Sequence, residues 1–365
     1  MKRFFLAALA VAAIASCAKN EVNEVSDNNQ ITFQTVVGPN TKALIDGTTY
    51  ATTDPSFGTF AYYTATGESF PTYADLYIPE SEVAYNNSLI AWTTATPYYW
   101  PKNGSLTFFS FSPWDINSSV ACDATNGIVI TEWDVNANQT VDVMVADVQT
   151  DQTANSSHGG YNGVPTIFRH KLSQIVNITF QTDKSYNAAD GVAGSPYVAG
   201  DKLFFINYVK FNDLEQTGTY TSGNNVNGTN LGSWELPTTP SYDHNYTWFN
   251  EATECDTEFN TGTSVNGMAN NYLLLMPQEY DDNVNPEAVS NIEIKYTIRT
   301  YTDASNFSDD VVTTHVSMYD IFSTSSNALA MNKKVTINFT IGVNQIYWAP
   351  SVEAWGDQTG AATIN

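Results

Sequence analysis

The sequence predicts an all-β protein made of two tandem β-sandwich domains. Helical periodicity is scarce along its 365 residues. Most apolar segments are short, rich in β-branched or aromatic residues, and end in Gly, Asn, Asp or Pro, which is typical of strands joined by turns. The chain is longer than one hydrophobic core usually serves, so two domains are expected. A hydrophobic content of 42% favours packed cores over disorder.

The first half of the chain supplies about six candidate strands, which is enough for one sandwich. Alternation within residues 31–37, ITFQTVV, places four side chains on one face: Ile31, Phe33, Thr35 and Val37. Similar segments follow at 57–64, 105–112, 127–133 and 140–148. We therefore expect an N-terminal β-sandwich domain over residues 31–165.

The second half supplies another set of strands. They are expected at 202–213, 271–280, 291–301, 311–320 and 333–348. In NIEIKYTIR, apolar residues alternate with Glu, Lys, Thr and Arg, so one side of this strand packs and the other meets water. The Asn-, Gly- and Thr-rich stretch 218–233 is expected to be a surface loop. Residues 166–365 form the predicted C-terminal domain.

The N-terminus resembles a bacterial export signal. Lys2 and Arg3 precede an apolar run that is too short for a membrane-spanning helix. The sequence IASC then matches a lipobox, so residues 1–16 are expected to be removed and Cys17 to carry lipid. A plain signal with an incidental cysteine is the alternative. Several acyl chains would hold Cys17 firmly to a membrane, with residues 17–30 as a flexible tether.

The chain is strongly acidic, with a formal net charge of -24. Such a surface repels nucleic acid and anionic lipid, so neither is an expected partner. Besides Cys17, only Cys122 and Cys255 are present. They could form one disulfide in an oxidising compartment or remain two free thiols.

No motif in the sequence supports catalysis or a cofactor. The four histidines stand apart without metal-ligand spacing: His158, His170, His244 and His315. No G-x-S-x-G elbow, P-loop or G-x-G-x-x-G occurs in the right context. Residues 134–139 begin like a calcium loop but lack its Gly and its final Glu, which indicates a polar turn. We expect no enzyme, metal or cofactor, although a carboxylate pair for glycoside hydrolysis is invisible to sequence reasoning.

The order of motifs resembles the fimbrillins of Bacteroidales, the subunits of type V pili, in their fimbrillin-like lipoprotein branch. A lipobox cysteine is followed by a polar tether, ITF, a Thr-Lys-Ala step, FGTFAYY and YYWPKNGSLTFFSFSP. FRHKLSQIVNITF, LLLMPQ and the ending VTINFTIGVNQIYWAPSVEAW complete the set. The resemblance covers nearly the whole chain after the signal sequence, and it implies two sandwich domains of the fimbrillin type.

The resemblance implies a structural, adhesive pilin that reaches the cell outer membrane as a lipoprotein. A trypsin-like protease would cut after Lys42, leaving Ala43 as the new N-terminus and releasing the first strand. Lys42 is the sole Lys or Arg between Lys19 and Lys102. Many relatives carry Arg at this place, so an Arg-specific protease is in doubt.

The resemblance also implies that the C-terminal segment of another subunit fills the vacated groove. Such a donor must be extended and apolar on alternate positions. Val352, Trp355 and Ile364 are the expected donor residues, although they could instead pack onto their own domain. Stalk, tip and anchor roles, and any host or bacterial receptor, stay open.

A glycan-binding lipoprotein anchored in the outer membrane is the rival hypothesis. The chain contains 21 Tyr, 19 Phe and 8 Trp, and some of these rings could stack on sugars. This hypothesis predicts an uncut monomer in which aromatic residues such as Trp234 and Trp248 are exposed together.

Overall fold

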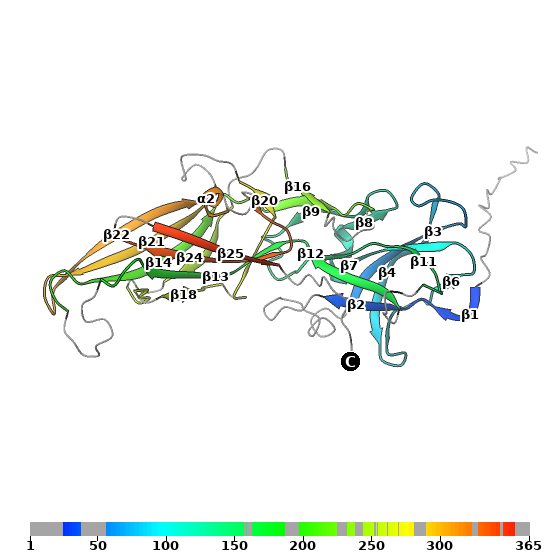
Figure 1. The fold of residues 1–365 in the computed structure, drawn as a ribbon, viewed down its shortest axis with the longest axis horizontal. Coiled ribbons are helices and arrows are strands. Elements are labelled where there is room, and N and C mark those ends of the chain that lie inside the picture. Colours follow the sequence, from blue (N-terminus) through cyan, green and yellow to red (C-terminus); the bar gives the residue numbers. More distant parts are fainter. Residues whose placement is uncertain are drawn as a thin grey trace, which may run out of the picture.

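The computed structural model describes residues 25–37, 56–156, 158, 163–186, 197–224, 232–237, 244–251, 253, 255–260, 262–268, 270–280, 290–322, 328–343 and 346–354. These residues form a nearly all-β protein, as the sequence predicts. The helical elements among them are a 3-10 helix, η1 (Trp114–Ser119), and a short α-helix, α2 (Met318–Phe322). Several sheets lie along one elongated molecule (Figure 1).

One eight-stranded sheet contains the first predicted strand. Its members are β2 (Phe33–Val37), β3 (Ser56–Thr64), β4 (Ala74–Asn86), β5 (Ala91–Thr94), β7 (Ser105–Ser112), β10 (Met144–Ala146), β11 (Gln149–Gln152) and β12 (Val164–His170). Their spatial order is β10-β12-β2-β5-β4-β3-β7-β11, and β10 also pairs with β7. The strands from β10 to β7 therefore close into a ring, with β11 attached to β7. A closed sheet leaves its member strands without free edges.

A second sheet covers one side of this ring. It consists of β8 (Val120–Asp123), β9 (Gly127–Asp134), β15 (Thr217–Thr221) and β16 (Ser233–Glu235), in the order β16-β15-β9-β8. Phe60 and Phe111 of the ring and Ile130 and Tyr220 of this sheet belong to one buried cluster. A further pair of strands, β1 (Val25–Gln30) and β6 (Tyr99–Pro101), lies beside the ring.

Two sheets form a sandwich at the other end of the molecule (Figure 1). One contains β13 (Ser173–Thr182), β18 (Thr263–Val265), β19 (Leu273–Leu275), β24 (Lys333–Ile341) and β25 (Ile346–Ala354). The other contains β14 (Lys202–Asn212), β17 (Tyr246–Asn250), β21 (Asn291–Tyr301) and β22 (Phe307–Ser317). A short pair, β20 (Gln278–Glu279) and β23 (Ala328–Leu329), completes the set.

Strand periodicity explains the core of this sandwich. Ile292, Ile294 and Ile298 of β21 are buried in the same cluster as Ile337 and Phe339 of β24. Because successive side chains of a strand point to opposite faces, the alternating apolar residues of each sheet meet between the two sheets. Burial of apolar surface of this kind is the main force that holds the sheets together.

Several predicted strands are shorter or differently divided in the structure. The single strand predicted over 333–348 is wrong, because these residues belong to two antiparallel strands, β24 and β25. Gly342 follows β24 and interrupts the alternation, as glycine does in turns. The surface loop predicted over 218–233 is wrong in part, because β15 and β16 lie within or overlap it. Tyr220 of β15 is almost fully buried.

Residues on both sides of the predicted domain boundary contribute strands to the sheets around the ring. The predicted boundary between residues 165 and 166 lies inside β12, and β15 and β16 return to pair beside β9. Residues 25–30, expected in the polar tether, form β1. Backbone pairing with β6 accounts for this strand, since a ladder needs no apolar sequence. The division into domains at 165/166 stays a prediction.

Candidate functional site: the first strand and the C-terminal strand

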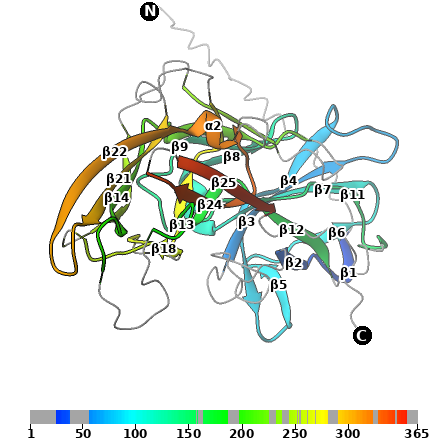
Figure 2. The ribbon, with the colours of Figure 1, turned by 60° about the vertical axis from the view of Figure 1, so that its left-hand side comes forward.

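The first predicted strand, β2, is a member of the closed ring, between β12 and β5; Figure 2 shows these three strands near one another. β2 runs parallel to β12 in continuous register, from Phe33 opposite Val164 to Val37 opposite Phe168. On its other side, Phe33 pairs with Trp92 of the antiparallel strand β5. β2 therefore connects two strands that do not pair with each other, and its removal would open the ring.

Buried side chains hold the beginning of this strand. Ile31 and Phe33 are 1% and 2% exposed. The ring of Phe33 meets the rings of Phe57 and Phe108 edge to face, with centroids 5.8 Å apart in both pairs. Edge-to-face contacts are a favourable arrangement for aromatic pairs. The apolar anchor of the first strand therefore consists of Ile31 and Phe33.

The backbone around this anchor is also closely fitted. Ile31 donates its backbone N–H to the carbonyl of Tyr98 at 2.8 Å, and Val164 donates to the carbonyl of Thr32 at 2.8 Å. Gly163 has a φ of +124°, and a Cβ there would lie 2.7 Å from the Thr32 carbonyl oxygen. Glycine at this position permits the close approach of the two strands.

The structure locates some of the predicted site residues and leaves others outside its described part. Ile31 and Phe33 are buried as alternation suggests, Thr35 is half-buried, and the backbone of Val37 ends β2. Val352 lies in β25. The lipidation and processing residues Cys17, Lys42 and Ala43, and the donor residues Trp355 and Ile364, lie outside the described residues.

β25 is an edge strand of the C-terminal sandwich. It pairs antiparallel with β24 from Ile341↔Ile346 to Lys333↔Ala354. Pro350 has no backbone N–H and is suited to a strand with one unpaired edge. Tyr347, Trp348 and Val352 are 52%, 36% and 37% exposed. The backbone ladder holds β25 in place, with a hydrogen bond from Trp348 Nε1 to the carbonyl oxygen of Asp320 at 3.2 Å. None of the side chains described for residues 346–352 is buried, which suits a segment that can change partners.

An ion pair that sequence reasoning missed fixes the strand beside β2. Arg169, near the end of β12, donates from Nε to Asp147 Oδ1 at 2.6 Å and from Nη2 to Oδ2 at 2.9 Å. His170 Nδ1 lies 2.9 Å from Asp142, and both side chains are almost fully buried. Paired, hydrogen-bonded charges of this kind can be buried. Arg169 and His170 of the FRHK motif thus anchor β12.

The aromatic residues named for a sugar platform are not exposed together. Trp248 is fully buried and donates Nε1–H to the carbonyl of Val265 at 2.7 Å. Trp234 is half-buried and donates to the carbonyl of Lys171 at 2.6 Å. Both indoles are therefore structural, and the glycan-binding hypothesis loses the feature that would distinguish it.

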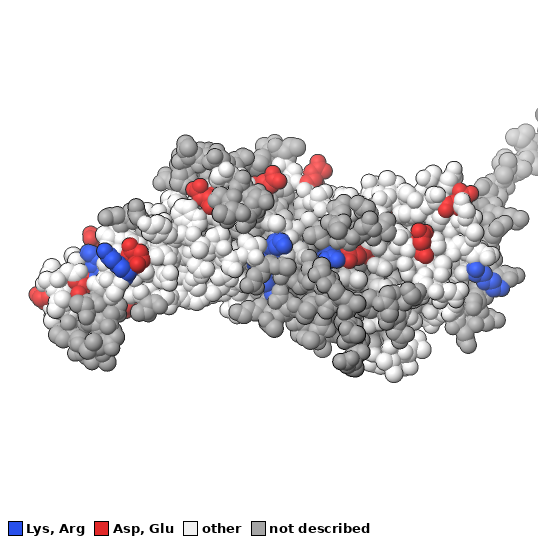
Figure 3. All heavy atoms as spheres, viewed as in Figure 1, with Lys and Arg blue, Asp and Glu red and all other residues white. Residues whose placement is uncertain are grey.

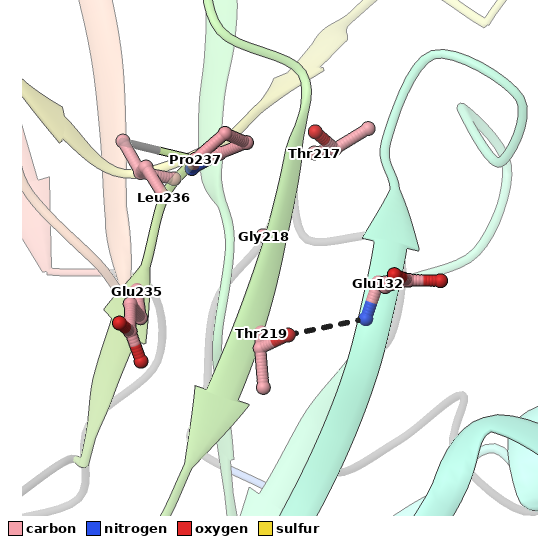
Figure 4. A pocket seen from close by; sticks show the side chains of 7 residues that line it. All are labelled: Glu132, Thr217, Gly218, Thr219, Glu235, Leu236 and Pro237. Carbon is pink, nitrogen blue, oxygen red and sulfur yellow. Dashed lines mark hydrogen bonds between the residues drawn. The ribbon is translucent and has the colours of Figure 1, made fainter. Parts of the chain in front are cut away.

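A shallow hollow of about 680 Å³ lies on the sheet formed by β9, β15 and β16 (Figure 4). Its lining residues are Glu132, Thr217, Gly218, Thr219, Glu235, Leu236 and Pro237. Glu132 has a φ of +50° at an irregularity of the β9–β15 register, as occurs in β-bulges. No aromatic ring is among the residues that line this hollow, so sugar stacking has no platform there.

The two cysteines are the remaining candidates for chemistry. Cys122 and Cys255 are free thiols, and burial raises the pKa of each. Both side chains are only partly buried, and a thiol with a raised pKa is less often in the nucleophilic thiolate form. Within the described ranges, no three His, Cys, Asp or Glu side chains are grouped to hold a metal ion. In that same part of the chain, no helix is long and apolar enough to cross a membrane.

The chain belongs to the fimbrillin-like family, whose model matches residues 41–355. A fimbrial protein from Bacteroides vulgatus has a similar structure, with 18% identity, a TM-score of 0.58, and coverage of 90% of this chain and 100% of that one. A protein from Parabacteroides distasonis, described as a candidate cell adhesion protein, has 14% identity, a TM-score of 0.50, and coverage of 91% and 98%. No curated protein matches the sequence.

Membership of this family supports a pilin-type adhesion subunit, and the two solved structures support the fold. The family implies association with other pilin subunits in cell-surface fimbriae, and a structural rather than a catalytic role.

Proposed function

We propose that this chain is a pilin subunit that polymerises by strand exchange. A trypsin-like protease cuts after Lys42, the first strand leaves, and the C-terminal segment of another copy takes its place. The product is an adhesive fibre at the cell surface. The observation that supports this proposal best is the position of β2 inside the closed ring, with Ile31 and Phe33 as its apolar anchor.

Cleavage changes the first strand from part of the chain into a bound peptide. Before the cut, the covalent connection keeps β2 at a high effective concentration beside β12. After the cut, noncovalent contacts alone hold it: the ladder to β12 and the side chains of Ile31 and Phe33. Burial of each side chain contributes roughly 1.5–3 kcal/mol. Contacts of this size allow the released strand to be replaced.

A donor must restore both kinds of contact. Its backbone must pair with β12, and apolar side chains must fill the places of Ile31 and Phe33. The C-terminal segment offers Val352, Trp355 and Ile364 for this purpose. Because a complete ladder and a buried anchor are remade between two chains, the joint should dissociate slowly.

The same cut would separate the subunit from its membrane anchor. A lipid on Cys17 ties the uncut chain to the outer membrane, and Cys17 lies on the N-terminal side of Lys42. The released subunit can then move into a fibre, whereas an anchor subunit would keep its lipid. The adhesive partner of the fibre would be a receptor or glycan on a host or bacterial surface.

The proposal is tested with purified chain, residues 18–365, and trypsin at a low ratio. We expect one early cut, a new N-terminus at Ala43 by sequencing, and growth into species that gel filtration resolves and SDS does not dissociate. A Lys42→Gln variant is the matched control and should remain an uncut monomer. A wild-type chain that is cut after Lys42 and stays monomeric would refute polymerisation, and the absence of any cut at Lys42 would refute the processing step.

A further inference from the structure

The tip of the β4–β5 hairpin carries exposed apolar side chains. Tyr85, Leu89 and Ile90 are 42%, 53% and 75% exposed. The turn that presents them is ordered, because Asn86 Oδ1 accepts the backbone N–H groups of Ser88 at 2.9 Å and Leu89 at 3.2 Å. These side chains are therefore displayed on a defined turn.

Ile90 is an unusual residue for this turn. Its φ is +52°, a conformation that costs a β-branched residue energy and that Asn, Asp or Gly adopts more readily. Because Ile90 is so exposed, its side chain buries little apolar surface within its own chain and so stabilises the fold little. Both facts suggest that the side chain makes its contact with a partner.

The hairpin meets the first strand at one register pair, and its tip extends from there. β5 runs antiparallel to β2 from the Phe33↔Trp92 pair, so Ile90, two residues before Trp92, lies toward the Thr35 end of β2. A strand that replaced β2 and entered at that end would pass the hairpin tip.

The short distance along the chain between the donor segment and β25 limits which surface of the second copy can reach this tip. If the donor segment begins at Val352, then Trp348 comes four residues earlier, within roughly 13 Å of extended chain. Tyr347 and Trp348 must then lie at the joint between two subunits. Both are exposed on β25 in the single chain.

The distribution of charged residues also favours contact between the hairpin tip and β25. Residues 83–101 and residues 335–352 contain no Asp, Glu, Lys or Arg, although the chain carries 38 acidic residues. Charged side chains on the face in Figure 3 form scattered groups, with uncharged surface between them. Two copies of net charge -24 repel each other, and this repulsion is weakest where charge-free surfaces meet.

We propose that Tyr85, Leu89 and Ile90 bind Tyr347 and Trp348 of a second copy of this chain. This contact rests on the proposed strand exchange and deepens it, because it sets the end at which the donor enters: beside Val37 rather than beside Val25. The two surfaces differ, so the contact is head-to-tail and continues from subunit to subunit as a fibre requires.

Ile90→Asp tests the contact without harm to the fold, because Asp tolerates a positive φ. After trypsin treatment, we expect its SDS-resistant ladders to form at least about tenfold more slowly than those of the wild type, since a charge then faces an apolar surface. Tyr347→Asp should slow assembly similarly. Leu76→Asp is the control, because Leu76 is 55% exposed and lies on β4 like Tyr85, but near the other end of that strand from the hairpin tip.

A charge exchange makes the test specific. Tyr347→Lys in the Ile90→Asp chain should restore assembly to within about threefold of the wild type, because opposite charges then face each other across the joint. Wild-type assembly by Ile90→Asp, or no recovery in the double variant, would overturn the contact. A wild-type chain that forms no ladders would instead overturn the strand exchange, and the contact with it.

Discussion

Phe33 of β2 lies opposite Trp92 of β5, in the one register pair that joins these two strands. On its other side the strand follows β12 over its whole length. The first strand is thus held by one long ladder and by the pocket around Phe33. This unequal attachment defines which substitutions should weaken the first strand.

Phe33→Ala should destabilise the uncut chain by about 3–5 kcal/mol, because it removes a buried ring and leaves a cavity beside Phe57 and Phe108. Thr35→Ala is the control, since Thr35 is only half-buried, and it should cost under about 1 kcal/mol. Urea unfolding measures both. Equal effects would contradict Phe33 as the anchor.

Gly163→Ala should destabilise the chain more than Gly67→Ala. Both residues have positive φ, +124° and +89°, so alanine is strained at each, by about 1–3 kcal/mol. At position 163 the new Cβ also meets the Thr32 carbonyl at 2.7 Å, whereas nothing lies within 4 Å at position 67. Thermal unfolding compares the two variants. A smaller loss for Gly163→Ala would show that β2 can move away from β12 without cost.

Arg169→Ala should cost about 1.5–3 kcal/mol, because it removes two charge-assisted hydrogen bonds to the largely buried Asp147. Arg299 makes a similar two-bond contact with Asp309 at a more exposed site. Asp309→Ala removes this ion pair but keeps Arg299 on the ring of Phe307, 3.9 Å from its centroid, and should therefore lose at most about 1 kcal/mol. Denaturant midpoints measure both variants. Equal losses would mean that burial does not strengthen the Arg169 pair.

Asp123 should make stability depend on acid pH. The backbone N–H of Asn126, with further bonds from the Asn126 side chain and Thr125, lowers the pKa of this carboxyl. A lowered folded-state pKa favours the folded chain above the unfolded pKa of about 4. This contribution disappears as pH falls through the folded-state pKa. The stability difference between wild type and Asp123→Ala should therefore shrink between pH 6 and roughly pH 3; a constant difference would exclude an ionic role.

Runs of apolar and β-branched residues predicted two strands with their bounds. The segment 291–301 is β21, and 105–112 is β7, with the predicted bounds. β4 was missed because the apolar residues of its sequence, ADLYIPESEVAYN, do not alternate regularly, most of its positions are exposed, and it contains Pro79. Its backbone pairs with β3 and β5 supply what its side chains do not.

The candidate site was predicted only in part, because only some of its features follow from local alternation. Ile31 and Phe33 follow from alternation, and they are buried. The closed ring, the Arg169–Asp147 pair and the ordered turn at Asn86 depend on long-range pairing or on hydrogen bonds, which single-sequence patterns do not encode. The processing of Lys42 and the fate of Trp355 and Ile364 stay predictions.

The pairing of β10 with β7 also affects when subunits can meet. A sheet with two loose ends could recruit strands from any neighbour during secretion, whereas in the described residues each strand from β10 to β7 has a partner on both sides. A cell could therefore stockpile precursor at its surface without premature clumping. Fibre length and number would then depend on the supply of active protease. Proteolysis, rather than the amount of subunit, would set the time at which adhesion begins.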